Sequence, residues 1–179
     1  NYIDKKTIAS DIEAAKAQQP DVIIACMHWG YEYKSLPHKD QTSLADWLFA
    51  QGVDHIIGSH PHVVQPLELR TDTITNKKNA IVYSLGNFIS NMSVRKTDGG
   101  IMFKMELTKD SLTQVTNCGY SLVWTAPPSV KRKKHTLIPV GFPTDSLSIS
   151  EQNKMDIFVK DTRKLFETHN KGINEYTFY

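Results

Sequence analysis

The sequence predicts one α/β domain that spans residues 1–179, and three observations support this prediction. The first half alternates helix-like and strand-like segments, which is the pattern of a layered α/β fold. Residues 22–27 form an unbroken apolar run, as expected of a strand buried on both faces of a mainly parallel sheet. With 179 residues, of which 40% are hydrophobic, the chain is long enough to bury one substantial core.

Two helices and three strands are predicted in the first half. Residues 7–18 have the apolar periodicity of a helix, which Pro20 stops. Residues 41–51 repeat apolar side chains at a spacing of three to four, with Asp40 as the expected N-cap and Gly52 at the end. Strands are expected at residues 22–27, 53–57 and 80–84, and Gln65 is interpreted as a structural residue on the strand after His62.

The second half changes character. Apolar and polar residues alternate there between turn signals, which predicts antiparallel strands at the side of the sheet, at residues 100–108, 112–125 and 136–142. The last helix is expected to begin near Ser148 or Ser150 and to end at about His169. Ser148 and Glu151 have the spacing of a capping box. No internal repeat or convincing domain boundary interrupts the sequence.

Charge gives little information about partners. The 21 basic and 19 acidic residues leave a net charge of +2, which does not favour nucleic acid, a membrane surface or an acidic partner. Residues 131–134 are basic, and we interpret them as a solvated hairpin turn whose replacement by Ser should hardly change stability. The alternative is a patch for an anionic polymer such as polyglutamate. Nucleic acid is disfavoured because no aromatic residues interleave the run.

Cysteine usage and the termini add three expectations. Cys26 and Cys118 lie far apart in apolar, strand-like sequence, so we expect buried free thiols. No apolar run approaches the ~18 residues that suggest a membrane span. The sequence opens on Asn1 without an initiator methionine or signal peptide, so we interpret it as a processed or shortened chain.

Three histidines follow predicted strands. His28 ends the first strand, and His60 and His62 follow the second. Ligands gather at the carboxyl ends of strands in open α/β sheets. Pro61 favours an extended His60, and residues two apart in an extended chain point the same way, so both imidazoles should face one point. Neutral imidazole binds Zn, Mn and Fe, so the pattern predicts a metal site.

These histidines also have a simpler interpretation. A lone histidine after a strand is more often a hydrogen-bonded packing residue than a ligand, so His28 alone does not indicate a metal. The His-Pro-His segment after a strand is less common by chance. The other histidines lack such a context and are interpreted as surface or packing residues: His38, His55, His135 and His169.

Several motifs, in order, resemble those of the bacterial capsule-synthesis (CapA/PgsA-like) family, whose fold is similar to calcineurin-like metallophosphoesterases. The motifs are His-Trp-Gly-Tyr-Glu-Tyr at residues 28–33, GVDHIIGSHPHVVQP at 52–66 and Tyr-Ser-Leu-Gly-Asn-Phe at 83–88, with Gln41 between them. The resemblance covers residues 21–92. It implies that the chain is the C-terminal portion of a larger domain, a two-sheet sandwich flanked by helices.

The resemblance implies roles for particular residues. His28 matches a lone histidine ligand, and His60 and His62 match a Gly-His-x-His element. By this resemblance, His28 and His60 share one divalent ion and His62 binds a second, and together they activate a water for in-line attack. Glu32 and Asn87 are candidate catalytic residues facing the same cleft. The alternatives for these two are a solvated loop acid and a turn-forming asparagine.

The family's carboxylate ligands are missing, because the sequence contains no Gly-Asp and no Asn-His pair. Two divalent ions ~4 Å apart repel strongly unless carboxylates lie between them, so we expect an incomplete site in an inactive chain. A single weakly held ion (Mn, Zn or Fe) on two or three imidazoles is the most expected. Without the missing N-terminal part, exposed sheet edges would favour self-association.

Three functions fit these features. The resemblance implies biosynthesis or export of an anionic capsule polymer such as poly-γ-glutamate, by metal-dependent hydrolysis or transfer. The alternatives are a metallophosphoesterase acting on a small phosphorylated substrate and a non-catalytic, polymer-binding assembly subunit. Upstream carboxylate ligands would favour the enzymes. The resemblance also implies a location in the cell envelope, outside the cytoplasmic membrane and anchored through the missing N-terminal part.

Overall fold

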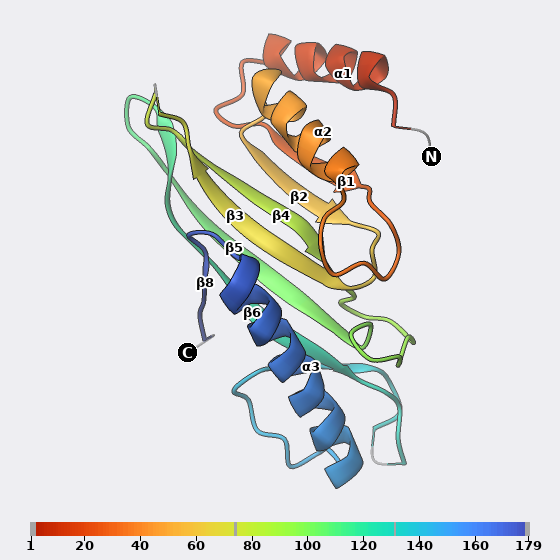
Figure 1. Cartoon of the computed structure of the whole chain (residues 1–179). Coiled ribbons are helices and arrows are strands. Elements are labelled where there is room, and N and C mark those ends of the chain that lie inside the picture. Colours follow the sequence, from red (N-terminus) through yellow and green to blue (C-terminus); the bar gives the residue numbers. More distant parts are fainter. Residues whose placement is uncertain (1–2, 74, 131, 178–179) are drawn as a thin grey trace.

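The computed structural model describes residues 3–73, 75–130 and 132–177, which form two four-stranded sheets and three helices. Helices α1 and α2 lie together on one side of the first sheet, and α3 lies along the second (Figure 1). The two sheets and α3 share one hydrophobic core, which includes Leu67, Leu122 and Phe158. A second core lies between the first sheet and helices α1 and α2. The predicted α/β fold is confirmed.

The first sheet brings two strand ends to one edge. Its order is β1-β2-β4-β3, in which the first three strands are parallel and β3 is antiparallel to β4. The strands are β1 (Ile24–His28), β2 (His55–Ser59), β3 (Val64–Thr71) and β4 (Lys78–Leu85). His28 pairs with Ser59, so the carboxyl ends of β1 and β2 meet. The segments that follow these two strands therefore leave the sheet side by side.

Strand β1 is more exposed than the sequence predicts. It lies at the edge of the sheet, and Ile24, Cys26 and His28 are exposed on one face. Only the alternate residues, Ala25 and Met27, pack toward the core under the helices. The expectations of a strand buried on both faces and of a buried Cys26 thiol are therefore wrong. An apolar run shows that a strand has hydrophobic faces, but it does not show that a second layer covers them.

Both helices that cover the first sheet have side-chain N-caps, and the bounds are α1 (Lys5–Ala17) and α2 (Lys39–Ala50). The carboxylate of Asp4 accepts hydrogen bonds from two backbone N–H groups at the start of α1. Helix α2 is capped by His38 and not, as predicted, by Asp40. The His38 ring accepts from the Asp40 N–H, while Gln41 accepts from the His38 N–H. This reciprocal pair is a capping box made with an unusual residue.

The second half forms a separate sheet instead of extending the first. Its strands are β5 (Gly99–Lys109), β6 (Thr113–Ala126), β7 (Thr136–Pro139) and β8 (Asn174–Glu175), of which the first three are antiparallel. Strand β8 is parallel to β6. The expected position at the side of the first sheet is therefore wrong, although one bridge between Gly86 and Gly100 joins the two sheets. Cys118 is half-buried on β6, and burial raises the pKa of its thiol.

Helix α3 (Ile149–His169) confirms the predicted capping box. The Ser148 hydroxyl accepts from the Glu151 N–H, and the Glu151 carboxylate accepts from the Ser148 N–H at 2.8 Å. The helix then packs Met155, Phe158 and Phe166 into the shared core. Three-to-four spacing of large apolar residues places them on the same face.

The basic run before β7 is only partly solvated. Lys131 lies outside the described residues, and Lys133 and Lys134 are exposed as predicted. The Arg132 side chain, in contrast, is 10% exposed and forms an ion pair with Glu151. Its guanidinium also donates to the carbonyl oxygens of Pro127 at 2.6 Å and Ser146 at 3.2 Å. For Arg132 the interpretation as a solvated turn is therefore wrong.

Asp98 is a buried acid with one unsatisfied oxygen. Its Oδ2 accepts from the Trp124 indole N–H at 2.9 Å, whereas Oδ1 has no hydrogen-bond partner among the described residues. Burial raises the pKa of the Asp98 carboxyl. Because the pKa of Asp98 is higher in the folded than in the unfolded state, protonated Asp98 stabilises the fold most below the unfolded pKa of about 3.9. This stabilisation is lost as the pH rises through the pKa of the folded state.

We therefore expect Asp98→Asn to stabilise the protein at neutral pH. The carboxamide oxygen still accepts from Trp124 and the side chain no longer carries a buried charge, so the free energy of unfolding at pH 7.5 should rise. The gain should shrink toward pH 4, where the native carboxyl also becomes neutral. Thermal unfolding of both proteins at the two pH values measures this difference. An equal change at both pH values would contradict the electrostatic explanation.

Candidate metal centre

The three predicted histidines lie together at the carboxyl edge of the first sheet. His28 is the last residue of β1, and His60 and His62 belong to the turn after β2. The ring centroids of His28 and His60 are 4.4 Å apart, and those of His60 and His62 are 6.1 Å apart. Parallel pairing of β1 with β2 explains this juxtaposition. That these rings bind a metal stays a prediction.

The turn that carries two of the histidines is strained. His60 has a φ of 102° and His62 a φ of 58°, so neither residue is extended, although Pro61 was expected to favour an extended His60. That expectation is wrong, and the two rings are brought together by a tight turn instead of by alternation along a strand. Positive φ angles are uncommon in residues with large side chains, and they cluster at functional sites.

Gly58 is required just before this turn. A Cβ at this position would lie 2.2 Å from the carbonyl oxygen of Tyr83 and 2.5 Å from Nε1 of Trp29. The Trp29 indole N–H donates to that same carbonyl oxygen at 2.9 Å, and Trp29 is buried. The residue after His28 therefore lies across β2 and contacts β4. This arrangement holds the ends of β1 and β2 in a fixed relation.

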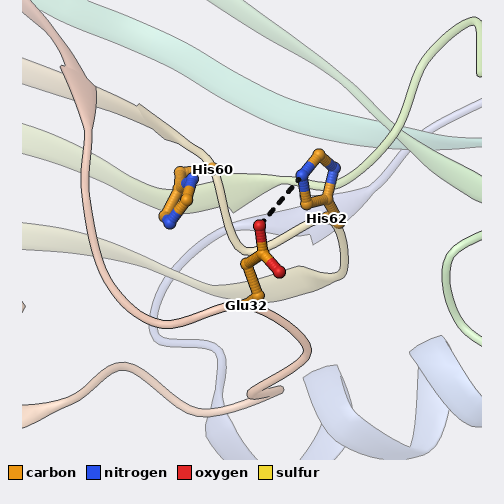
Figure 2. A group of neighbouring side chains, drawn as sticks. All are labelled: Glu32, His60 and His62. Carbon is orange, nitrogen blue, oxygen red and sulfur yellow. Dashed lines mark ion pairs between the residues drawn. The ribbon is translucent and has the colours of Figure 1, made fainter. Parts of the chain in front are cut away.

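Glu32 reaches the histidines from the loop after β1. The N–H of its neighbour Tyr33 donates to the Pro61 carbonyl at 2.8 Å, which ties this loop to the histidine turn. Oε1 of Glu32 lies 3.9 Å from Nε2 of His62 (Figure 2). The Tyr33 ring stacks against His62, with centroids 6.1 Å apart, and the charge of Glu32 raises the pKa of Tyr33.

Two buried glutamines hold the same loop in place. Nε2 of Gln65 donates to the carbonyl of Lys34 at 2.8 Å and to that of Leu36 at 3.3 Å. Its Oε1 accepts from Nε2 of Gln41 at 2.8 Å. Both glutamines are almost fully buried. The Gln41 side chain also packs against Gly30 so closely that a Cβ on residue 30 would lie 2.6 Å from it. Gln65 therefore acts structurally, through the loop that carries Glu32.

Within the described part of the chain, one group of side chains could share a metal ion: Glu32, His60 and His62. Their ligand atoms all lie within 4.8 Å of one another, and Figure 2 shows the Glu32 carboxylate pointing toward the two rings. Neighbouring ligands about 2.1 Å from one ion lie about 3.0–3.4 Å apart, so a contraction of up to about 1.5 Å would bring the three ligand atoms around one ion. His28 is outside this group, and its ring lies against that of His60.

Asn87 orients one of these histidines. Nδ2 of Asn87 donates to the Thr97 carbonyl at 2.7 Å, so Oδ1 is the atom that faces Nδ1 of His62, at 3.0 Å. An acceptor at this position fixes the proton on Nδ1 and leaves the lone pair on Nε2. The structure thus places Asn87 behind His62, away from Glu32. The Thr97 carbonyl, which fixes the amide orientation, has no signal in the sequence.

The other histidines lie outside the cluster. His38 caps α2, and His55 is buried within β2, where its Nδ1 accepts from the Ala80 N–H at 3.1 Å. Burial lowers the pKa of His55. His135 is half-buried near β7, and His169 is exposed at the end of α3. These positions agree with the interpretation as surface and packing residues.

Comparisons with known proteins identify the class. The family model of the bacterial capsule synthesis protein PGA_cap matches residues 1–92. The chain is 31% identical over 121 residues to the PGA biosynthesis protein CapA of Bacillus subtilis (strain 168). This match covers 66% of the chain and 30% of that protein. The chain is also 32% identical over 100 residues to the capsule biosynthesis protein CapA of Bacillus anthracis. This second match covers 53% of the chain and 23% of that protein.

The two sheets and their flanking helices constitute a metallophosphoesterase-like α/β fold. The chain belongs to the bacterial capsule synthesis family, as its motifs predicted. It spans less than a third of the length of either relative. None of the described helices is both long and apolar enough to cross a membrane.

Proposed function

We propose that this chain takes part in making or exporting an anionic capsule polymer of the poly-γ-glutamate type, through a divalent-metal-dependent hydrolase or transferase site. The observation that carries the proposal is the convergence of His28, His60 and His62 where β1 and β2 end. Membership of a capsule synthesis family supports the polymer, and the names of both relatives refer to capsule or PGA biosynthesis.

The side chains present fit a divalent ion. His60 and His62 supply neutral imidazole, Glu32 supplies a carboxylate, and such mixed nitrogen and oxygen ligands suit Mn, Zn or Fe. A bound ion polarises a phosphate or amide oxygen and acidifies a coordinated water. Asn87 keeps the proton of His62 on Nδ1, while the Tyr33 ring lies nearly parallel to that imidazole, with centroids 6.1 Å apart. Anionic substrate groups would approach from the exposed side of the cluster.

A two-ion centre needs bridging carboxylates, and Glu32 is the one acid in the ligand group found among the described residues. We therefore propose that this chain alone is inactive, and that the rest of a two-ion site lies in a part of the protein outside it. The same observation favours a second candidate, a non-catalytic polymer-binding assembly subunit. Under either proposal the protein acts in the cell envelope, anchored through that other part.

Replacing His60 in the full-length protein tests the site. We expect His60→Ala to lower polymer production by cells at least about 100-fold, since even partners outside a coordination shell contribute 10–100-fold. His169→Ala is the matched control, because His169 is exposed at the end of α3, and it should leave production unchanged. Polymer is quantified against the amount of folded protein. Normal production by the His60→Ala cells would exclude a functional metal site at this position.

A second measurement separates the two candidates. Purified full-length protein is incubated with poly-γ-glutamate and Mn²⁺ or Zn²⁺, and the polymer length is followed. Shortening or transfer that disappears in His60→Ala supports the enzyme. Retention of the polymer without any change in its length supports the assembly subunit.

A further inference from the structure

We propose that Glu32 is a metal ligand and that it forms, with His60 and His62, a site for one divalent cation whose three protein ligands all lie in this chain. The inference rests on the proposed function, since it concerns the same cluster. The inference adds a ligand, because the family resemblance implies only histidine ligands in this chain. That resemblance also assigns His28 and His60 to the same ion. The geometry points to a different grouping, in which a carboxylate from the loop after β1 joins the His-Pro-His turn.

The loop that carries Glu32 is held in position by hydrogen bonds. Hydrogen bonds to Pro61 on one side and from Gln65 on the other fix the loop immediately after Glu32. Gln65 has an exposed fraction of 0%, so this support comes from the protein interior. A carboxylate on a supported loop loses less conformational entropy on binding than one on a free loop.

His62 presents its free ring nitrogen to Glu32. The Asn87 carboxamide oxygen accepts a hydrogen bond from Nδ1–H, so the lone pair is on Nε2, and Nε2 is the atom 3.9 Å from Glu32. A histidine whose other nitrogen donates to an oxygen acceptor is the usual arrangement of a metal ligand. The strained φ angles of His60 and His62 are consistent with rings positioned for function.

The charge and number of these three ligands suit a single divalent ion. Two imidazoles and one carboxylate bind Zn or Fe(II) in many proteins and leave coordination positions open. A divalent ion with a single carboxylate keeps a net charge of +1, so the open positions favour an anionic group, a phosphate or a polymer carboxylate. A single ion also avoids the repulsion that prevents two ions from sharing a site without bridging carboxylates.

Zn²⁺ titration of the whole chain tests this site. Isothermal titration calorimetry should give one equivalent for the native chain, and Glu32→Gln should weaken the affinity about 100-fold or more, beyond the effect typical of groups outside the coordination shell. Glu13→Gln is the matched control, because it removes one exposed carboxylate on α1 and should bind as the native chain does. Co²⁺ provides an independent readout, since loss of an oxygen ligand changes its visible absorption.

The possible results distinguish this inference from the proposed function. One equivalent of Zn²⁺, weakened by Glu32→Gln but not by Glu13→Gln, supports the three-ligand site. Binding that is equally tight in Glu32→Gln overturns the role of Glu32 and leaves the histidine site standing. No binding by the folded native chain, verified by circular dichroism, overturns this inference, whereas the proposed function is decided separately by the polymer yield of His60→Ala cells.

Discussion

Gly58→Ala is expected to lower the free energy of unfolding by about 3 kcal/mol or more, because the added Cβ clashes with atoms that packing and hydrogen bonds hold in place. The nearest atom, 2.2 Å away, is the backbone oxygen of Tyr83 in the neighbouring strand β4. The next is Nε1 of Trp29, which donates to that same oxygen. Relieving the clash requires separating β2 from β4, and this separation breaks ladder hydrogen bonds as well as the indole contact.

Urea unfolding followed by circular dichroism measures this effect. Ser59→Ala is the control next in sequence, because it removes one hydroxyl, which donates to the Met27 carbonyl at 3.2 Å, and adds no atom. Its cost should be about 1 kcal/mol. We also expect Gly58→Ala to weaken Zn²⁺ binding, since the displaced strand leads directly into the turn of His60. A Gly58→Ala protein as stable as the native one would show that the two strands are not packed as described.

Arg132→Ser is expected to lower the free energy of unfolding by about 3 kcal/mol, as for other nearly buried ion pairs that lose one partner. Arg132 and Glu151 have side chains 10% and 15% exposed, so little water would replace the lost guanidinium. The carbonyls of Pro127 and Ser146 would lose their donors too. Glu151 would remain as the capping residue of α3, but with an unpaired charge.

Neighbours in the basic run supply the comparison. Lys133→Ser and Lys134→Ser remove exposed charges and should each change stability by about 0.5 kcal/mol or less. Arg132→Lys should recover part of the loss, because an ammonium keeps the charge but cannot present the planar fork that contacts several oxygens together. Equal effects at the three positions would indicate that the whole run is solvated, as its composition first suggested.

Sequence reasoning was most successful where a local pattern is sufficient. The helices, the capping box of Ser148 and Glu151, and the strands that end near the histidines follow from periodicity and cap chemistry. The juxtaposition of His28 with His60 follows from two parallel strands that end at one edge. These features follow from local patterns together with the general rule that parallel strands of one sheet present their carboxyl ends at the same edge.

Features that depend on distant contacts were not predictable. The exposure of β1 depends on what covers its outer face, and the burial of Arg132 depends on a helix that begins 17 residues later. The conformation of the His60 turn is imposed by surrounding packing and opposes the local preference of an X-Pro segment. The orientation of His62 requires Asn87 and Thr97, which no short motif connects to it.

The position of β1 at the edge of the sheet has a consequence for motion at the cluster. Among the described strands β1 pairs with β2 alone, whereas β2 is held on both sides. Strands with fewer partners open locally at lower free energy, so amide hydrogens of β1 should exchange with solvent faster than those of β2 and β4. His28 is therefore attached to an edge strand of this sheet, while the turn carrying His60 follows a central one. Transient opening of β1 would move His28 away from a site whose other members stay in place.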